Sequence, residues 1–269
     1  MLSKDTQLCI SLAGRPGNHG TRFHNYLYDE LGLDFVYKAC TTADLPAALA
    51  GVRALGIRGC SVSMPFKEDS IPLVDELDPS AAAIASINTI VNDDGHLRAY
   101  NTDYLAVAEL LAEHQVPLDE PAAVLGSGGM AKAVVAALSD GGWQDVTVVA
   151  RNERTGRALA ERYDARWTAE LGVQRPRLVV NATPVGMAGG PAAEQLPVAD
   201  EVVDAAEVVF DVVAMPVETP LLQRAGRAGV RTIDGGQVIA RQAAGQFALY
   251  TGVRPTPEQV ARAEAAASA

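Results

Sequence analysis

The sequence predicts an α/β protein built from two domains. Its 269 residues exceed the usual size of a single domain. Along most of the chain, short apolar stretches alternate with helix-like stretches, which is the pattern of parallel strands joined by crossover helices. The alternation stops near residue 236, and only two helical stretches follow it. We therefore expect this tail to pack on the first domain, so that residues 1–102 and 236–269 form one domain and residues 103–235 are inserted as the other.

The first domain is expected to combine parallel strands with one hairpin. A loop rich in Gly, Pro and Asn follows the first strand, and Thr21 is available as the N-cap of the helix after that loop. Asp94-Gly95 is a hairpin signal between two later strands. In order, we expect strands at 7–14, 34–39 and 59–64, helices at 21–31 and 44–55, and hairpin strands at 86–92 and 97–101.

Residues 122–138 read as a buried strand, a glycine turn and a helix in immediate succession. Gly126 allows a sharp turn, Gly128 leaves the backbone open to a pyrophosphate, and Ala131 lets the helix pack on the strand. The free N–H groups at the start of that helix would face the phosphates. The same GxGxx(G/A) string also occurs in ordinary strand–helix loops, but the flanking strand and helix favour a Rossmann-type dinucleotide-binding domain. We expect a cleft between this domain and the first.

The other expected elements of the second domain continue the alternation. They are a helix that opens at 101–103 and runs to about Glu113, a strand at 145–150, a helix at about 153–163, strands at 178–182 and 208–213, a helix after Pro220, and a strand at 230–233. The tail helices are expected at 237–250 and 256–267.

Composition excludes several classes of partner. A net charge of −11 argues against nucleic acid and anionic membrane surfaces, and it means that individually placed Arg and Lys residues must hold any anionic ligand. No 18-residue apolar run could span a bilayer, and the first residues lack the apolar core of a signal peptide, so we expect a cytoplasmic protein. The three Cys and four His have no metal-ligand spacing, and we predict no metal site. A monomer and a homodimer both remain open.

Two arginines follow the second strand of the inserted domain. Arg151 and Arg154 stand near a helix start, where the helix dipole disfavours positive charge unless an anion is bound. The 2′-phosphate of NADP is such an anion, and guanidinium groups suit it in charge and geometry. The alternatives are a solvated Arg–Glu pair with Glu153, or Glu153 holding the ribose of NAD. We therefore favour NADP over NAD.

Seven stretches, taken together and in this order, resemble the shikimate dehydrogenase family over nearly the whole chain. They are Ser-Met-Pro-Phe-Lys at 63–67, Ile-Asn-Thr at 87–89, Asn-Thr-Asp at 101–103, Gly-Ser-Gly-Gly at 126–129, Asn-Ala-Thr-Pro-Val-Gly-Met at 181–187, the Asp-to-Leu stretch at 211–222 and the Gln-to-Gly stretch at 242–252. The resemblance implies reversible hydride transfer between shikimate and NADP at the C3 carbon, giving 3-dehydroshikimate.

The resemblance also assigns roles to residues of this chain. Lys67 matches the family's catalytic lysine and Asp103 the aspartate beside it, while Ser63, Asn88 and Gln242 match polar positions that hold the cyclohexene ring. The loop at 181–187, with Thr183, resembles the loop beneath the nicotinamide. The positions that match cofactor contacts are Gly126, Ser127, Gly128, Gly129, Met130, Arg151, Asn152, Arg154, Val212 and Gly235.

Chemistry independently supports Lys67 and Asp103. An alcohol gives up a hydride productively only if its proton also leaves, so a proton acceptor must lie within about 3 Å of the hydroxyl. The sequence offers no Ser-Tyr-Lys set for this step. Lys67 comes directly after an apolar strand, at the end where α/β sites form, although a surface lysine could stand there too. We treat Lys67 and Asp103 as a coupled pair and assign the proton to neither.

Two departures from the family pattern concern the substrate. The family binds the substrate carboxylate with a Ser-x-Ser pair in the first loop, whereas this loop offers Asn18 and Thr21, with Arg15 or Arg22 as added charge. Ala214 stands where the family usually has a tyrosine. This combination resembles the shikimate dehydrogenase-like subgroup, for which poor shikimate turnover or a related substrate is expected. Quinate, aminoshikimate or another hydroxy acid is one alternative, and a non-catalytic NADP(H)-binding sensor is the other.

Overall fold

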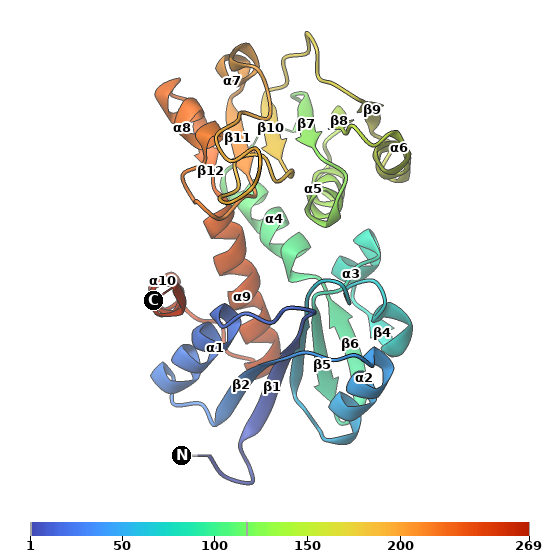
Figure 1. The fold of residues 1–269 in the computed structure, drawn as a ribbon, viewed down its shortest axis with the longest axis vertical. Helices are drawn as coiled ribbons and strands as arrows, with labels where there is room; N and C mark the ends of the chain where they lie inside the picture. Colours follow the sequence, from blue (N-terminus) through green and yellow to red (C-terminus); the bar gives the residue numbers. More distant parts are fainter. Residues whose placement is uncertain (1, 117, 269) are drawn as a thin grey trace. The chain divides into compact units, whose positions relative to one another are not determined.

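The chain folds into two units. The computed structural model describes residues 2–116 and 118–268, so the expected domain limits at 1 and 269 lie outside the described residues. One unit consists of the residues up to Thr102 together with those from Ala240 onward, and the other runs from Asp103 to Ile239. In Figure 1 the red C-terminal helix α10 (Pro257–Ser268) lies beside the blue helix α1 (His19–Glu30), both in the first unit.

The first unit contains a mixed six-stranded sheet in the order β2-β1-β3-β5-β6-β4. β1 pairs in parallel with β2 and β3, as expected for strands joined by crossover helices, whereas β5 pairs antiparallel with both β3 and β6. The strands are β1 (Gln7–Leu12), β2 (Phe35–Cys40), β3 (Gly59–Val62), β4 (Glu76–Leu77), β5 (Thr89–Asp93) and β6 (His96–Tyr100).

Helices cover both faces of this sheet, because successive strand residues point to opposite faces. In β1, Cys9 packs with α1, α10 and the later part of α9, while its neighbour Ile10 packs with α2 and α3. The helices of this unit, beside α1 and α10, are α2 (Leu45–Ala54), the 3₁₀ turn η1 (Ile71–Leu73), α3 (Pro79–Ile84) and α9 (Gly235–Thr251), which begins in the other unit.

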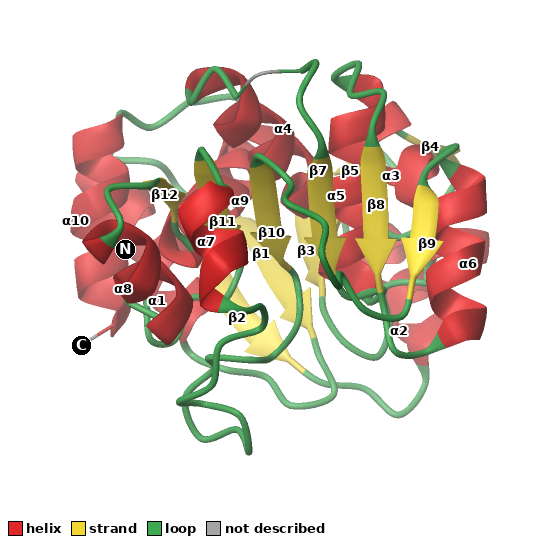
Figure 2. Cartoon of the chain, turned by 90° about the horizontal axis from the view of Figure 1, so that it is seen from above, coloured by secondary structure: helices red, strands yellow, loops and turns green. Residues whose placement is uncertain are grey.

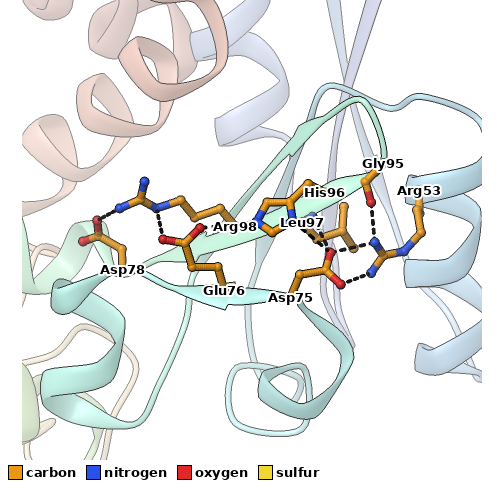
Figure 3. Close-up of polar contacts among 8 residues, drawn as sticks. All are labelled: Arg53, Asp75, Glu76, Asp78, Gly95, His96, Leu97 and Arg98. Carbon is orange, nitrogen blue, oxygen red and sulfur yellow. Dashed lines mark hydrogen bonds and ion pairs between the residues drawn. The ribbon is translucent and has the colours of Figure 1, made fainter.

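The hairpin and the edge of this sheet are held locally. Asp94 and Gly95 both have positive φ, +51° and +91°, as a two-residue type I′ turn requires. Around it, Asp75 accepts from Arg53 at 2.6 Å and from the Leu97 N–H at 2.7 Å (Figure 3). Farther along the edge, Arg98 pairs with Asp78 at 3.0 Å. These contacts tie α2 and the edge strand β4 to β6.

The second unit contains a six-stranded parallel sheet in the order β12-β11-β10-β7-β8-β9. Figure 2 shows these six strands side by side. Renumbered within the unit, this is the 3-2-1-4-5-6 order of doubly wound dinucleotide-binding sheets. The strands are β7 (Ala122–Leu125), β8 (Val146–Val149), β9 (Arg166–Thr168), β10 (Leu178–Asn181), β11 (Val208–Asp211) and β12 (Arg231–Ile233).

Two helical layers complete this unit. In β7, Val124 packs with α4, α5 and α6, whereas Leu125 packs with α7 and α8 on the opposite face. The predicted Rossmann-type architecture is therefore confirmed. The helices are α4 (Thr102–Glu113), α5 (Gly129–Asp140), α6 (Glu153–Arg162), α7 (Asp200–Ala205) and α8 (Pro220–Arg227). No helix among the described residues is both long and apolar enough to cross a bilayer.

One capping prediction is wrong. Helix α1 begins at His19 with Asn18 at the N-cap, so Thr21 lies inside the helix. The Thr21 hydroxyl oxygen accepts from the Ala39 N–H at 3.2 Å, which ties α1 to β2. This tertiary contact, which the local sequence does not display, takes the oxygen that a cap would have used. The short elements η1, β4, α3, β9 and α7 were not predicted either.

Candidate functional site

The glycine turn after β7 has the geometry of a phosphate-binding loop. Gly126 has a φ of +112°, and a Cβ there would lie 2.9 Å from the carbonyl oxygen of Ala182, so only glycine fits. At Gly128 and Gly129 a Cβ would meet no described atom within 4 Å. The turn is therefore closed on the side of β10 and open on the other, which leaves room for a ligand against the backbone.

The helix that follows presents free donors at its start. α5 begins at Gly129, and its N-cap Gly128 has no side chain to cap the first N–H groups. Such a start favours an anion, because the unpaired N–H groups and the helix dipole both point to it. Ala131 is fully buried, as the close helix–strand packing requires. Met130 is partly buried against the same core.

A hydroxyl pair links this turn to the charged segment after β8. The Ser127 Oγ and the Thr155 Oγ1 lie 2.7 Å apart, within hydrogen-bonding distance. Thr155 is also bound through its N–H, since Asn152 caps α6 with its side-chain oxygen at 3.2 Å. The segment 151–155 is thus held beside the glycine turn by side chains of its own.

The charges of this segment suit a phosphate better than a ribose diol. Arg151 and Arg154 are exposed and form no ion pair with other described residues. Glu153, by contrast, accepts from the Arg157 Nε at 2.8 Å, and the Arg157 guanidinium in turn lies 4.3 Å from the centre of the Trp167 ring. The acidic side chain is therefore directed along the helix, and two cations remain for an anion.

The loops after β10 and β11 are joined by a buried polar network. The Asn181 side chain donates to Asp211 at 2.9 Å and to the Val185 carbonyl at 3.1 Å, and accepts from the Thr183 hydroxyl at 2.6 Å. The Val212 N–H donates to the Asn181 carbonyl at 3.0 Å. Thr183 also lies against the glycine turn, 3.4 Å from a Cβ built at Gly126. This network brings together Gly126, Thr183 and Val212, three of the residues predicted to bind the cofactor.

Gly235 closes the same region. A Cβ at this position would clash with the Val213 carbonyl group, so the start of α9 can approach the loop after β11 only with glycine there. The residues present at this edge of the sheet therefore fit a dinucleotide: an open turn, free helix N–H groups, two unpaired arginines and a rigid loop. Among the described residues no cluster of side chains could hold a metal ion.

In the first unit, Ser63 and Lys67 stand in the turns that follow β3. Ser63 is exposed and Lys67 is partly buried. Ser63 donates its N–H to the Leu12 carbonyl, and the Lys67 carbonyl accepts from the Ile87 N–H at 3.1 Å. The backbone of Lys67 therefore lies beside the segment that carries Asn88.

Asn88 is a buried polar side chain of this unit whose oxygen is held by several donors. It is 2% exposed, and its Oδ1 accepts from the Thr89 hydroxyl at 2.8 Å, the Thr102 N–H at 2.8 Å and the Thr102 hydroxyl at 3.1 Å. Its Nδ2 has no hydrogen-bond partner among the described residues. Leaving a buried donor without a partner costs about 1–3 kcal/mol of stability. A native protein that bears this cost usually has a use for the donor, such as binding a ligand.

Helix α9 supplies two glutamines to the same place. The Gln242 Oε1 lies 3.5 Å from the Thr102 hydroxyl, and one turn later the Gln246 Nε2 donates to the Asn88 carbonyl at 3.3 Å. The buried ring of His24 stacks on Tyr37, with 4.4 Å between the ring centres, and a contact with Gln246 opposes part of the effect of burial on its pKa. Burial lowers the pKa of His24 to about 3, so the ring is neutral at physiological pH.

The start of helix α1, directly after the first loop, is held to the C-terminal helix α10. Asn18 is exposed at the start of α1, and its side chain makes no capping bond. His19 pairs with Glu264 of α10 at 2.9 Å, and this hydrogen bond raises the pKa of His19. Arg22 donates to the Ala267 carbonyl at 3.4 Å. Asn18 and Arg15 are thus the loop side chains of the candidate set that are exposed to solvent.

Asp103 lies in the first turn of α4, directly after Thr102, and is partly buried. It begins the second unit, whereas Lys67 belongs to the first. Within the units, the structure gathers Asn88 with Gln242 and the glycine turn with Thr183. Sequence reasoning missed the contacts of Thr102 and Gln246 with Asn88, and that of Thr155 with Ser127, because each joins residues at least 14 positions apart in the chain. It also missed the bond from the adjacent Thr89, because the side-chain orientation on which that bond depends is not visible in the sequence.

Comparisons with known proteins agree with this geometry. Residues 19–90 match the model of the shikimate dehydrogenase substrate binding domain. The chain is 54% identical to a shikimate dehydrogenase-like protein of Haemophilus influenzae over 265 residues, which cover 98% of each protein. A shikimate 5-dehydrogenase of Thermus thermophilus, solved with NADP(H) and shikimate, is 32% identical with a TM-score of 0.84 and coverage of 97% and 99%. A quinate dehydrogenase of Corynebacterium glutamicum, solved with NAD, is 28% identical with a TM-score of 0.87 and coverage of 97% and 98%.

Proposed function

The chain belongs to the shikimate dehydrogenase family, and from this premise we propose that it is an NADP-dependent oxidoreductase that interconverts shikimate, or a close polyhydroxylated cyclic acid, and the corresponding ketone. The observation that carries the proposal is the full-length match to a shikimate dehydrogenase solved with NADP(H) and shikimate. The Asn88 Nδ2, which has no partner among the described residues, and the open glycine turn support it from the chain's own residues. Residues 1–102 and 236–269 would serve the substrate and residues 103–235 the cofactor.

NADP, when bound, accepts or supplies the hydride. The turn from Gly126 to Met130 would hold the pyrophosphate through backbone N–H groups, and Arg151 and Arg154 would hold the 2′-phosphate, with Asn152 at the ribose. Thr183, Val212 and Gly235 would border the nicotinamide. The engaged position of Glu153 supports NADP over NAD, because its carboxylate would otherwise compete with a phosphate.

The hydroxyl proton requires a side chain of the protein. In this proposal Lys67 and Asp103 form the acid–base pair, which takes the proton as the alcohol becomes a ketone and returns it in the reverse direction. A short backbone path supports the pairing: Lys67 is bonded to Ile87, and the neighbouring Asn88 is bonded to Thr102, which precedes Asp103. The two groups are treated as one unit, and the proton is assigned to neither.

Ser63, Asn88 and Gln242 would bind the ring hydroxyls, with Asn18 and Thr21 nearest to the carboxylate. A second candidate substrate class is quinate, aminoshikimate or another hydroxy acid. Three features favour it: the first loop lacks serines, Ala214 is small, and a quinate dehydrogenase is among the similar structures. The loss of one hydrogen bond to the substrate carboxylate would reduce the catalytic efficiency with shikimate about 10- to 100-fold, since a hydrogen bond to a charged group contributes about 1.5–3 kcal/mol.

A substrate panel tests the proposal. The purified protein is given NADP⁺ or NAD⁺ with shikimate, quinate, aminoshikimate and simple 2-hydroxy acids, and reduction is followed at the NADPH absorbance band. Turnover with shikimate or quinate is expected, with NADP⁺ preferred. Tight NADPH binding without turnover on any substrate would instead indicate a non-catalytic NADP(H) sensor.

The Lys67→Ala variant tests the acid–base assignment. It should lose turnover by about 10²- to 10⁴-fold, the usual contribution of general acid–base catalysis, while NADPH binding is kept. Lys38→Ala is the matched control, because Lys38 is an exposed lysine on β2. Near-normal turnover of Lys67→Ala would overturn the role of this lysine.

A further inference from the structure

The orientation of the Asn88 amide is fixed by hydrogen-bond chemistry. The Thr102 N–H can only donate, so the atom of the Asn88 amide that faces it at 2.8 Å must be the oxygen. The Thr89 hydroxyl donates to the same oxygen at 2.8 Å. The amide therefore cannot turn over without placing its NH₂ group against the Thr102 N–H, and its Nδ2 remains directed away from these donors.

The hydroxyl of Thr102 adds a third donor and a link to α9. It lies 3.1 Å from the Asn88 Oδ1 and 3.5 Å from the Gln242 Oε1. With one proton, it can donate to one of these oxygens at a time, and the Asn88 oxygen is the nearer. The methyl group of Thr102 packs separately, 3.5 Å from a Cβ built at Gly245. Thr102 is 1% exposed, so solvent does not compete for its hydroxyl.

We propose that Thr102 is a positioning residue that holds the Asn88 amide with its Nδ2 presented to the substrate as an obligatory hydrogen-bond donor. The inference rests on the proposed function and deepens it. The group that Asn88 meets on the substrate must offer a lone pair, as a hydroxyl or carboxylate oxygen does. An ammonium group has no lone pair and would be rejected there, because two donors would face each other without an acceptor.

Two variants separate the hydroxyl of Thr102 from its methyl group. Thr102→Val keeps a methyl group against Gly245 and removes the hydroxyl, whereas Thr102→Ser keeps the hydroxyl and removes the methyl. We expect Thr102→Val to raise the KM for the cyclic acid about 3- to 10-fold, the effect of one hydrogen bond, and to leave the KM for NADP⁺ within about 2-fold. Thr102→Ser should restore the KM for the acid to within about 2-fold of the wild type.

Asn88→Asp provides an independent arm of the test. It is nearly isosteric and keeps an oxygen for Thr89 and Thr102, but it replaces the donor Nδ2 with an acceptor. We expect the KM for the acid to rise about 100-fold or more, since an acceptor would face a lone pair in a buried site. Thermal unfolding of each variant shows whether it is folded, and Thr89→Val, which removes the second hydroxyl donor, replaces Thr102→Val if the latter does not fold.

The outcomes distinguish this inference from the proposed function. Unchanged KM for the acid in Thr102→Val and Thr89→Val, with wild-type turnover intact, would overturn the positioning role alone. A Thr102→Ser variant no better than Thr102→Val would assign the effect to packing against Gly245 and would also overturn it. If the wild type itself neither binds nor converts any cyclic acid of the panel, the proposed function fails and the inference fails with it.

Discussion

The side-chain amide of Asn181 donates to the buried carboxylate of Asp211 at 2.9 Å, which joins the loops at the carboxyl ends of β10 and β11. Asp211 is completely buried and also accepts from the Thr219 hydroxyl at 2.7 Å and from the Val213 N–H at 3.0 Å. Burial raises the pKa of Asp211, and these three donors oppose the rise. The carboxylate is thus the acceptor around which both loops are arranged.

Removal of this acceptor should destabilise the second unit. Asp211→Ala leaves the donors of Asn181, Thr219 and Val213 buried without a partner, and each such donor costs about 1–3 kcal/mol. Because the loops can partly relax, we expect a total loss of about 2–4 kcal/mol in the free energy of unfolding, measured by urea denaturation. Asp119→Ala, at an exposed position, is the control and should change stability by less than about 0.5 kcal/mol. A similar effect of both variants would contradict the role given to Asp211.

Because His24 is buried, we expect the free energy of unfolding to decrease as the pH falls below neutrality. Its pKa is lowered by burial from 6.5 to about 3, so between these values the unfolded chain binds a proton that the folded chain does not. Stability from the neutral ring is complete above pH 6.5 and is lost progressively as the pH falls toward 3. From pH 7.5 to pH 5 the loss is about 2 kcal/mol, set mainly by the unfolded pKa.

His24→Phe tests this linkage. A phenyl ring can occupy the stack on Tyr37 but does not titrate, so the loss between pH 7.5 and 5 should be smaller by about 2 kcal/mol in the variant. At pH 7.5 the variant should be about 1 kcal/mol less stable, because the buried Gln246 side chain loses its polar neighbour. Urea denaturation at both pH values measures the difference. His114→Gln, at a partly exposed histidine, should retain the acid loss of the wild type.

The fold could be predicted from the sequence where short-range signals were strong. The glycine turn, the buried strands around it and the Asp94-Gly95 hairpin each carry their signal within a few residues, and the structure confirms them. The tail helices could be placed by elimination, since no strand followed them. The three-residue strand β9 and the six-residue helix α7 lack such signals, because elements this short show no hydrophobic period.

The candidate site was less readable, for a physical reason. Resemblance pointed to Asn88, but the donors that orient it come from positions 89 and 102, and only the folded sheet places Thr102 beside it. Thr21 is a second example. Its residue type is common at helix N-caps, but its hydroxyl oxygen instead accepts a hydrogen bond from the Ala39 N–H of strand β2. Tertiary partners decide how polar side chains are used, and a single sequence does not name them.

Arg151 and Arg154 predict the preference for NADP. Each makes a charge-assisted contact with the 2′-phosphate in the proposed function, so Arg151→Ala and Arg154→Ala should each raise the KM for NADPH about 10-fold. The KM for NADH should change less than about 2-fold, because that cofactor lacks the phosphate. Arg175→Ala, an arginine that bonds only local carbonyl groups of its own loop, is the control for general charge effects. Equal losses for NADPH and NADH would rule out a 2′-phosphate contact.

Two glycines of the same turn should fail for different reasons. Gly126 has a φ of +112° and a Cβ there would lie 2.9 Å from the Ala182 carbonyl oxygen, so Gly126→Ala is expected to cost about 2–4 kcal/mol of stability. Gly128 has a φ of −83° and open space around it, so Gly128→Ala should fold with stability within about 1 kcal/mol of the wild type.

The open space at Gly128 is where the pyrophosphate would approach the backbone. A methyl group there should therefore weaken NADPH binding about 10-fold or more, even though the protein remains folded. Gly51→Ala in α2 is the matched control: it also meets open space, and it should leave NADPH binding unchanged. Urea denaturation and NADPH fluorescence titration of Gly126→Ala, Gly128→Ala and Gly51→Ala separate the effect on stability from the effect on NADPH binding. Wild-type affinity for NADPH in Gly128→Ala would show that the phosphates do not lie on this turn, because an added Cβ would clash with a phosphate in contact with the Gly128 backbone.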